Sequence, residues 1–466
     1  MTQSLHEATT QSPPTRVRWL ILSFVFLISV VTVVDRVNIS VAAQYIMPEY
    51  GLSQVQMGTI FSAFILGYTV GFIPGGWLGD RLGPRVVLTG ALLVWSFLTI
   101  ATAWAGDIFL TSLVGVGGSF LCIRFLFGMG EGPAYPNSNR LTANWFPLTE
   151  KAVATSVALA GVGVGAMIAP PLVAWIMVEW GWRAAFYVTG LAGVFVAASW
   201  YYYGRDYPEK HGAVNHAELQ WIRSGNDSHS PPSAISDAPS LSTPWRVLLS
   251  SRDLWLMIAS YLGLTYVAYT FVSWFYLYVV NELHFSVQTG AWLSTLPFVT
   301  IVFFSPGGGM LSDALVQRYG VRVGRISVAC GSLLLTALFL HLGAVTTDPY
   351  VSIALLSLGH GLLFATAAVY WASIVEMAKE HAGTASALLL TGGHLGGIIG
   401  PTLSPILAER FGWTLAFECL AGAALLSAGI CVFVHPERPL GAPIASTPSR
   451  THTLPAPFDN RETPAG

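Results

Sequence analysis

The sequence predicts an all-α membrane protein in which twelve transmembrane helices form two pseudo-symmetric bundles of six. Three observations point to this fold class. Hydrophobic residues make up 53% of the 466 residues and charged residues only 10%, against about 25% charged in a typical globular chain. Twelve apolar stretches are each long enough to cross a bilayer, which takes about 20 residues. The two halves of the chain also repeat the same short motifs.

The apolar stretches follow one another with short connections, except in the middle of the chain. The first is too long for a signal peptide and lacks a small-residue cleavage site, so we expect it to remain as a helix. The expected spans are 19–43, 54–78, 86–105, 109–136, 152–178, 184–204, 254–280, 288–312, 326–344, 350–376, 383–408 and 413–434. Polar, proline-rich segments separate and follow the two sets of six. We therefore expect a cytoplasmic N-terminus at 1–18, a bundle at 19–204, a cytoplasmic linker at 205–253, a second bundle at 254–435 and a disordered cytoplasmic tail at 436–466.

An internal repeat supports the division into two bundles. Three landmarks recur at offsets of 233, 231 and 231 residues, namely Asp80 and Asp313, Pro170 and Pro401, and the Gly-Trp pairs that begin at Gly181 and Gly412. Nearly constant offsets imply a six-plus-six duplication. Repeats of this kind move against each other around a central binding site in secondary transporters.

The positions of the basic residues predict the orientation in the membrane. Of the 22 Lys and Arg residues, Arg36 and Arg124 lie inside predicted helices, and only Arg183 and Arg410 lie in the short loops on one side. The other eighteen fall on the opposite side. Because basic residues collect on the cytoplasmic side, both termini are expected in the cytoplasm.

Two acid–arginine pairs stand out in the first and fourth apolar stretches, Asp35 with Arg36 and Arg124 with Glu131. A charge at the bilayer centre costs at least about 2.5–3.5 kcal/mol, so such residues are functional candidates by default. Arg124 and Glu131 are seven residues apart and share one helix face. At a rise of about 1.5 Å per residue, both arginines lie at a similar depth, about 24–27 Å from cytoplasmic arginines. The guanidinium group favours a carboxylate substrate.

The loop after the second helix carries a motif of its own. Residues 76–85 read GWLGDRLGPR, and residues 308–313 form a degenerate copy in the second half. This motif resembles the loop 2–3 sequence of the major facilitator superfamily. The resemblance implies conformational gating by Asp80, Arg81, Arg85 and Asp313, with Asp80 meeting a helix N-terminus or an Arg in the outward-facing state.

Longer motifs resemble the anion:cation symporter family within that superfamily. They are DRVNIS at 35–40, RFLFGMGEGPAYP at 124–136, WFP at 145–147 and WFYLY at 274–278. That family includes bacterial permeases for hexuronate, galactonate and glucarate, and the resemblance covers residues 16–435. It implies that Arg36 contacts the substrate carboxylate, that Asp35 and Glu131 are proton sites, that Arg124 shapes the site, and that Tyr68 lines the pocket.

Two departures from the sugar-acid permeases affect the expected substrate. The fifth helix has a Gly161–Gly165 run where those permeases place a polar residue, and residues 390–395 lack the asparagines typical of the eleventh helix. These changes favour a substrate acid that either carries fewer hydroxyl groups or is aromatic. Further substrate contacts are then expected from Tyr266, Trp274, Trp371 and His394, although the aromatics also suit helix packing, and His360 and His394 also suit hydrogen-bonded core positions.

The sequence thus predicts a proton-coupled symporter that imports a small organic carboxylate, such as a sugar acid, across the inner membrane. We expect a monomer in the lipid bilayer, with no enzymatic activity, no cofactor, no metal and no nucleic-acid partner. A uniporter or efflux carrier of the same fold, with Na⁺ as another coupling ion, remains an alternative, as does a membrane transceptor. The buried charges could instead form a purely structural ion network between the first and fourth helices.

Overall fold

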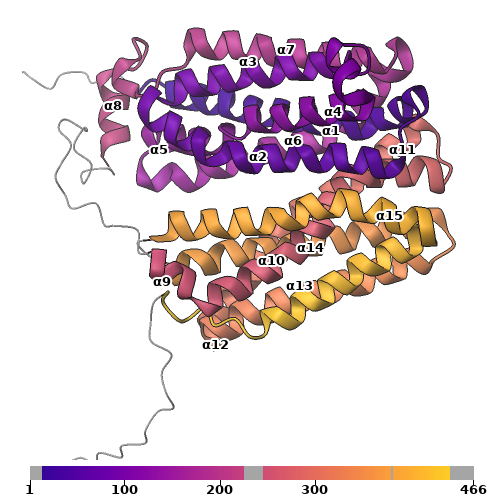
Figure 1. Ribbon diagram of the computed structural model, residues 1–466. Coiled ribbons are helices and arrows are strands. Elements are labelled where there is room, and N and C mark those ends of the chain that lie inside the picture. The colour runs from indigo at the N-terminus through magenta and orange to yellow at the C-terminus, as the bar shows by residue number, and fades with distance from the viewer. Residues whose placement is uncertain (1–12, 225–244, 379–380, 441–466) are drawn as a thin grey trace, which may run out of the picture.

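The computed structural model describes residues 13–224, 245–378 and 381–440, and the described chain contains helices and no strands (Figure 1). The first half folds into α1 (Val17–Tyr50), α2 (Gln54–Leu82), α3 (Pro84–Thr102), α4 (Phe109–Glu131), α5 (Ala134–Trp145), α6 (Leu148–Trp180) and α7 (Trp182–Tyr203). The second half folds into α10 (Arg252–Leu277), a short π-helix at Tyr278–Glu282, α11 (Val287–Leu293), α12 (Leu296–Tyr319), α13 (Val321–Val345), α14 (Pro349–Ala378) and α15 (Ala382–Cys431).

The helices confirm the predicted fold class. Within the described residues, eleven helical spans are long and apolar enough to cross a membrane. The longest, α15, is interrupted at Gly412, whose φ of 85° lies in the left-handed region and divides it into two segments. Glycine is the residue that adopts this conformation without a steric penalty. The eleven spans therefore supply twelve membrane crossings, as the sequence predicts.

Close packing between α2 and α4 positions the residues discussed below. Gly67, Gly71 and Gly75 lie four residues apart on one face of α2 and face the backbone of the α4–α5 region. A Cβ atom on Gly71 would lie 2.4 Å from the carbonyl oxygen of Met129. From the other side, Gly128 on α4 faces the backbone of Phe64. Small residues at this spacing let two helix backbones approach closely, so α2 side chains lie directly beside those of α4.

The two bundles contact each other toward one end of the molecule, where α11 packs on α6 (Figure 1). Ser62 on α2 donates a hydrogen bond to the carbonyl of Ile398 at 2.6 Å and lies 2.9 Å from the Thr402 hydroxyl on α15. Tyr276 on α10 donates to Gln44 on α1 at 2.9 Å. Farther along α2, Thr69 meets His394, and beyond it no hydrogen bond joins the bundles among the described residues. The bundles are therefore closed at the α11 end.

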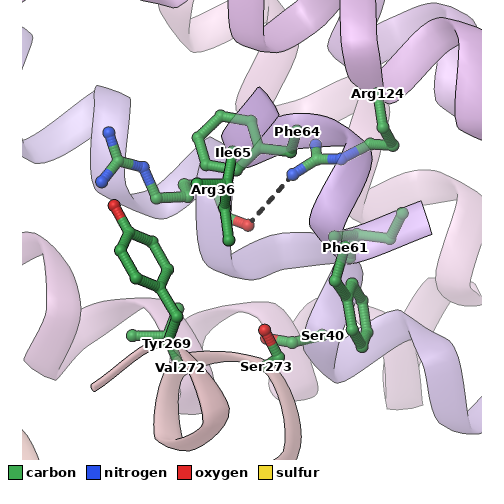
Figure 2. Close-up of a pocket in the computed structure, with 10 residues that line it drawn as sticks. Arg36, Ser40, Phe61, Phe64, Ile65, Arg124, Tyr269, Val272 and Ser273 are labelled. Atoms are coloured by element: carbon green, nitrogen blue, oxygen red, sulfur yellow. Dashed lines mark hydrogen bonds between the residues drawn. The ribbon is translucent and has the colours of Figure 1, made fainter. Parts of the chain in front are cut away.

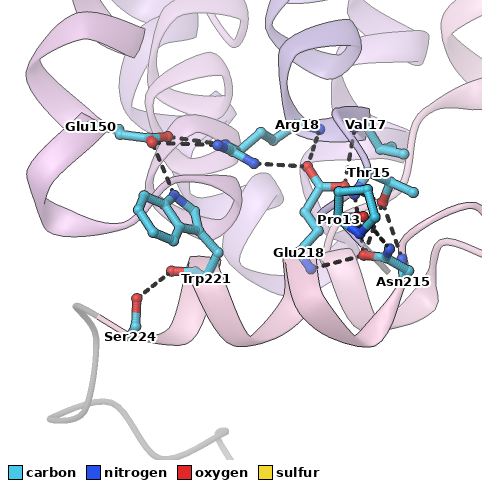
Figure 3. A network of polar contacts seen from close by, with 9 residues as sticks. All are labelled: Pro13, Thr15, Val17, Arg18, Glu150, Asn215, Glu218, Trp221 and Ser224. Carbon is cyan, nitrogen blue, oxygen red and sulfur yellow. Dashed lines mark hydrogen bonds and ion pairs between the residues drawn. The ribbon is translucent and has the colours of Figure 1, made fainter. Parts of the chain in front are cut away.

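The first part of the predicted linker is ordered and attached to the first bundle. Within α8 (His216–Arg223), the buried Glu218 accepts hydrogen bonds from the Thr15 hydroxyl at 2.5 Å and from the backbone N–H of Val17 at the start of α1 (Figure 3). Arg18 bridges Glu218 at 3.1 Å and Glu150 of α6 at 3.0 Å. These contacts join α1, α6 and α8. The short helix α9 (Trp245–Ser250) then leads into the second bundle, while the predicted linker residues 225–244 and most of the predicted tail, 441–466, lie outside the described residues.

Candidate functional site

A small pocket lies between the two bundles, at the contact of α1, α2 and α4 with α10 (Figure 2). Two arginines lie on its wall, one from α1 and one from α4. The lining residues are Arg36, Ile39, Ser40, Phe61, Phe64, Ile65, Arg124, Tyr269, Val272 and Ser273. The pocket thus brings the charged positions found in the sequence to the interface between the two bundles.

Arg36 forms an ion pair with Glu131, whose side chain is fully buried. One carboxylate oxygen of Glu131 accepts from the guanidinium, and the other meets no hydrogen-bond donor among the described residues. The Arg36 guanidinium also lies 5.1 Å from the Phe64 ring centroid and 5.2 Å from that of Tyr68. An arginine that reaches both an acid of the protein and a pocket can exchange one carboxylate for another.

Asp35 is fully buried and does not line the pocket. The closest donors to its carboxyl group are Thr189 on α7 and Trp95 on α3, yet neither oxygen meets hydrogen-bond geometry in the described chain. Thr189 itself accepts a hydrogen bond from Asn38 at 3.0 Å. As expected for adjacent helical positions, Asp35 and Arg36 point in different directions.

Arg124 is 2% exposed and lies on the pocket wall without pairing with Glu131. Its guanidinium donates a long hydrogen bond of 3.4 Å to the backbone carbonyl of Arg36 (Figure 2). The expected interaction between Arg124 and Glu131 along α4 is therefore absent as a direct contact among the described residues, and Glu131 pairs with Arg36 of α1 instead. Glu131 lies within electrostatic reach of both arginines.

Tyr68 and His394 lie beside the pocket but do not line it, whereas the sequence analysis expected Tyr68 in the pocket lining and His394 among the substrate contacts. Their rings meet edge to face with centroids 5.7 Å apart, and the His394 Nδ1 atom lies 2.9 Å from the Thr69 hydroxyl. Tyr269 on α10 lies 6.1 Å from His394 and turns its hydroxyl group toward Arg36 (Figure 2). These aromatic side chains bring α2, α10 and α15 together next to Arg36.

Three further predicted substrate contacts lie outside the pocket lining. Trp274 donates a 2.8 Å hydrogen bond to the carbonyl of Pro401 and packs on Phe61, so it joins α10 to α15 and α2. Tyr266 packs against α15 near Gly400, and Trp371 lies beside Tyr261. All three serve helix packing here, which is the alternative that the sequence left open for aromatic residues.

The predicted gating residues make contacts within their own bundles. Asp80 forms an ion pair with Arg140 on α5, and Arg81 lies 4.1 Å above the Trp77 ring. Arg85 donates to the carbonyl of Tyr201 at 2.5 Å. In the second bundle, Arg325 contacts both Asp313 at 2.6 Å and Glu376 at 2.5 Å. Each repeat thus has an acid that pairs with an arginine, on α2 in the first bundle and on α12 in the second.

Several pocket residues are absent from the sequence-based candidates. Phe64 is the most important of them, because its ring lies 5.1 Å from the guanidinium carbon of each arginine. Phe61, Ser40 and Ser273 also line the pocket. Phe61 and Phe64 precede Tyr68 by seven and four residues, which is one helix face. Extending the face of Tyr68 backwards along the helix would have found them.

Two other histidines lie away from the pocket. His360, noted in the sequence, is fully buried among aromatic rings, stacked on Phe271 with centroids 4.6 Å apart. His341 on α13 meets Glu418 at 2.6 Å.

Comparison with known proteins finds a matching family model and several similar transporters. The family model of the Major Facilitator Superfamily matches residues 25–375 and, in a second overlapping match, residues 276–462. The chain is 31% identical to the "Probable sulfoacetate transporter" of Cupriavidus necator, over 94% of this chain and 99% of that protein. It is 31% identical to the D-galactonate transporter of Escherichia coli, over 89% and 95% of the two chains. The hexuronate transporter of Bacillus subtilis is 28% identical, with 89% and 92% covered.

Solved structures share the fold at low sequence identity. A bacterial homologue of the lysosomal transporter Spinster, in an inward-facing and occupied conformation, superposes with a TM-score of 0.71 at 17% identity and covers 90% of this chain and 96% of its own. A D-xylose–proton symporter gives a TM-score of 0.67 at 18% identity, with 90% and 98% covered. These similarities agree with the two-bundle architecture.

Proposed function

Because the chain belongs to the major facilitator superfamily, we propose that it imports a small organic carboxylate together with protons by alternating access across the inner membrane. The observation that carries the proposal is the buried Arg36–Glu131 ion pair beside a pocket between the two bundles. The similar proteins named for galactonate, hexuronate and sulfoacetate transport all carry acids, which supports an anionic substrate here.

The ion pair gives a route to coupling. A substrate carboxylate that binds Arg36 needs the same guanidinium that Glu131 occupies. Protonation of Glu131 removes its negative charge and releases the guanidinium for the substrate, because a neutral carboxyl competes poorly for an arginine. Substrate and proton therefore bind together. When the substrate leaves on the other side, Arg36 pairs again with Glu131, which gives up its proton.

Asp35 is the proposed second proton site. Its carboxyl group is enclosed among α1, α3 and α7 without a cationic partner in hydrogen-bond contact. A buried carboxylate that lacks donors is costly, and a proton removes that cost. Since Asp35 interacts electrostatically with both Glu131 and Arg124, its protonation depends on the state of the pocket.

Alternating access requires that the contacts at the α11 end open while others form at the opposite end. The hydrogen bonds of Ser62 and Tyr276 close the end that we assign to the outside. The motif residues Asp80, Arg81, Arg85 and Asp313 lie near the other end, where we propose that they stabilise the outward-facing state. Asp80 and Asp313 form ion pairs with Arg140 and Arg325 within their own bundles, and in this proposal the two bundles approach each other at this end.

The test is uptake of a radiolabelled panel of hexuronates, aldonates, aldarates, aromatic acids and sulfoacetate into proteoliposomes with an imposed inward proton gradient. We expect one class of acid to accumulate only with the gradient, and Arg36→Ala to abolish its accumulation. Arg223→Ala is the matched control, because Arg223 forms an exposed ion pair on α8. Equal exchange with the gradient collapsed would indicate a uniporter, and no accumulation of any acid would overturn the proposal.

A further inference from the structure

The pocket contains a second guanidinium group that the coupling scheme does not use. Arg124 is 2% exposed, lies on the pocket wall and makes no ion pair within the described part of the chain. Its only hydrogen bond there is the 3.4 Å contact to the carbonyl of Arg36, and its Nε atom has no acceptor.

The surroundings of Arg124 compensate only part of its charge. The guanidinium carbon lies 4.3 Å from the Phe127 ring centroid and 5.1 Å from that of Phe64. Cation–π contacts of this kind stabilise a desolvated guanidinium, but they supply no hydrogen-bond acceptor for its N–H groups. Glu131 and Asp35 also lie within electrostatic reach of Arg124, so the guanidinium loses this compensation when both acids are protonated, and the pocket is then the open side from which an anion can arrive.

The two arginines are close enough to bind one small molecule. Both guanidinium carbons lie 5.1 Å from the same Phe64 centroid, so they are at most 10.2 Å apart. Figure 2 shows their side chains on opposite sides of Phe64. A charge-assisted contact spans about 3 Å between heavy atoms, so a substrate with two anionic groups on a short skeleton is long enough to contact both guanidinium groups.

The charge balance of the site leads to the same substrate. The cluster holds two arginines and two acids, Asp35 and Glu131, and is neutral when all are charged. With both acids protonated, the cluster carries two positive charges in a low-dielectric region, and a dianion restores neutrality where a monoanion leaves one charge uncompensated. We infer that the substrate is a compact dianion that places one anionic group on Arg36 and the other on Arg124, and that it enters with two protons in an electroneutral step. This inference rests on the proposed function.

The rest of the pocket agrees with a short, poorly hydroxylated skeleton. Apart from the two arginines, the only polar side chains among the lining residues are Ser40, Ser273 and Tyr269, and each supplies one hydroxyl group. The remaining wall is aliphatic or aromatic. Each sugar hydroxyl buried there without a partner would cost binding free energy, so a polyhydroxylated acid is disfavoured.

The experiment compares dianions with monoanions of similar length in proteoliposomes, with malonate, succinate and sulfoacetate against propionate and butyrate. Sulfoacetate is informative because its sulfonate stays charged, so its carboxylate can carry at most one of the two protons and the protein must carry at least the other. We expect the dianions to accumulate about tenfold or more above the monoanions, because each charge-assisted contact is worth about 1.5–3 kcal/mol. Uptake should follow the pH gradient and stay unchanged when a potassium diffusion potential, negative inside, is imposed.

The variants Arg124→Gln and Arg124→Lys locate the second anionic group. We expect Arg124→Gln to lose at least about tenfold in dianion affinity and Arg124→Lys to recover part of it, since lysine keeps the charge without the fork. The control is the elution profile of the detergent-purified protein. If Arg124→Gln elutes as a single peak, as Arg223→Gln does, its loss of dianion affinity does not result from misfolding.

Three results would overturn the inference. They are equal uptake of monoanions and dianions, acceleration of dianion uptake by the inside-negative potential, and unchanged dianion affinity in folded Arg124→Gln. Accumulation of monocarboxylates alone would overturn this inference and leave proton-coupled carboxylate import standing. If no acid accumulates, the proposed function itself fails.

Discussion

Arg36 on α1 pairs with Glu131 on α4, although Arg124 lies on the same helix as Glu131 and only seven residues before it. The ion pair joins two helices, and its Arg36 member lines the pocket. A change in the charge of Glu131 therefore acts directly on a pocket residue. Arg124 is left without an acid in contact among the described residues. In the proposed scheme, Arg36 is therefore shared with the proton site and Arg124 binds the ligand.

Asp35→Asn should abolish accumulation of the substrate while preserving its exchange. The amide cannot carry a proton, but the residue does not line the pocket, so binding at Arg36 should persist. The measurement is uphill uptake and counterflow in vesicles that contain the same amount of protein. Asp348→Asn is the control, since Asp348 caps α14 through backbone N–H groups and asparagine caps equally well. Uphill accumulation by Asp35→Asn would remove this residue from the coupling scheme.

Cysteines at positions 62 and 402 should trap the closed end of the carrier. The hydroxyl oxygens of Ser62 and Thr402 lie 2.9 Å apart across the two bundles, which is within reach of a disulfide. In a background without the four native cysteines, oxidation of Ser62→Cys/Thr402→Cys should stop uptake, and a reductant should restore it. The single variants should keep their activity under oxidation. Full activity of the cross-linked protein would show that this contact does not open during transport.

Gly71→Ala should destabilise the first bundle. The added Cβ would lie 2.4 Å from the Met129 carbonyl oxygen, and such overpacking costs about 1–3 kcal/mol. Gly76→Ala is a matched control five residues farther along α2, because its Cβ would meet only the Pro136 side chain at 3.8 Å. We expect a lower melting temperature for Gly71→Ala in detergent and an unchanged or higher one for Gly76→Ala. Equal melting temperatures would argue against close α2–α4 packing.

Docking of the linker residues 205–224 onto the first bundle should weaken at acidic pH. Burial, together with Arg205, lowers the pKa of His211 from its ordinary value of 6.5, and the ring packs against Tyr203 and Trp145. The docked form then binds a proton less readily than the released form. Docking is fully stable above pH 6.5 and weakens as the pH falls below it.

Hydrogen–deuterium exchange of residues 205–224, corrected for its intrinsic pH dependence, checks this expectation. Exchange should be faster at pH 5.5 than at pH 7.5. His211→Phe keeps an aromatic ring without a titrating group and should remove the difference. A difference of the same size in the variant would assign the effect to another group.

The fold was largely predictable from the sequence, because hydropathy and the repeat report on helix number directly. The Gly-Trp repeat even located the break at Gly412 that separates the last two helices. The glycines of α6 also behave as expected of small residues four apart, since Gly161 and Gly165 both pack on α1.

The site was predictable only in part. The sequence identified Arg36, Arg124, Asp35 and Glu131 as buried charges, but it did not show which acid meets which arginine. Partner choice depends on how α1 and α4 are rotated and spaced, which is determined only in the folded bundle. The aromatic candidates show the same limit, since Trp274 satisfies its indole N–H within the fold and lies outside the pocket.

The most direct test is the pH of the outer medium when substrate is added to lightly buffered, energised vesicles. If Glu131 must take up a proton before Arg36 can bind the substrate, addition of the transported acid should make the medium more alkaline. Glu131→Gln should bind and exchange the acid without this pH change. Substrate entry in the unaltered protein with no alkalinisation, or an undiminished pH change in Glu131→Gln, would contradict proton coupling through the Arg36–Glu131 pair.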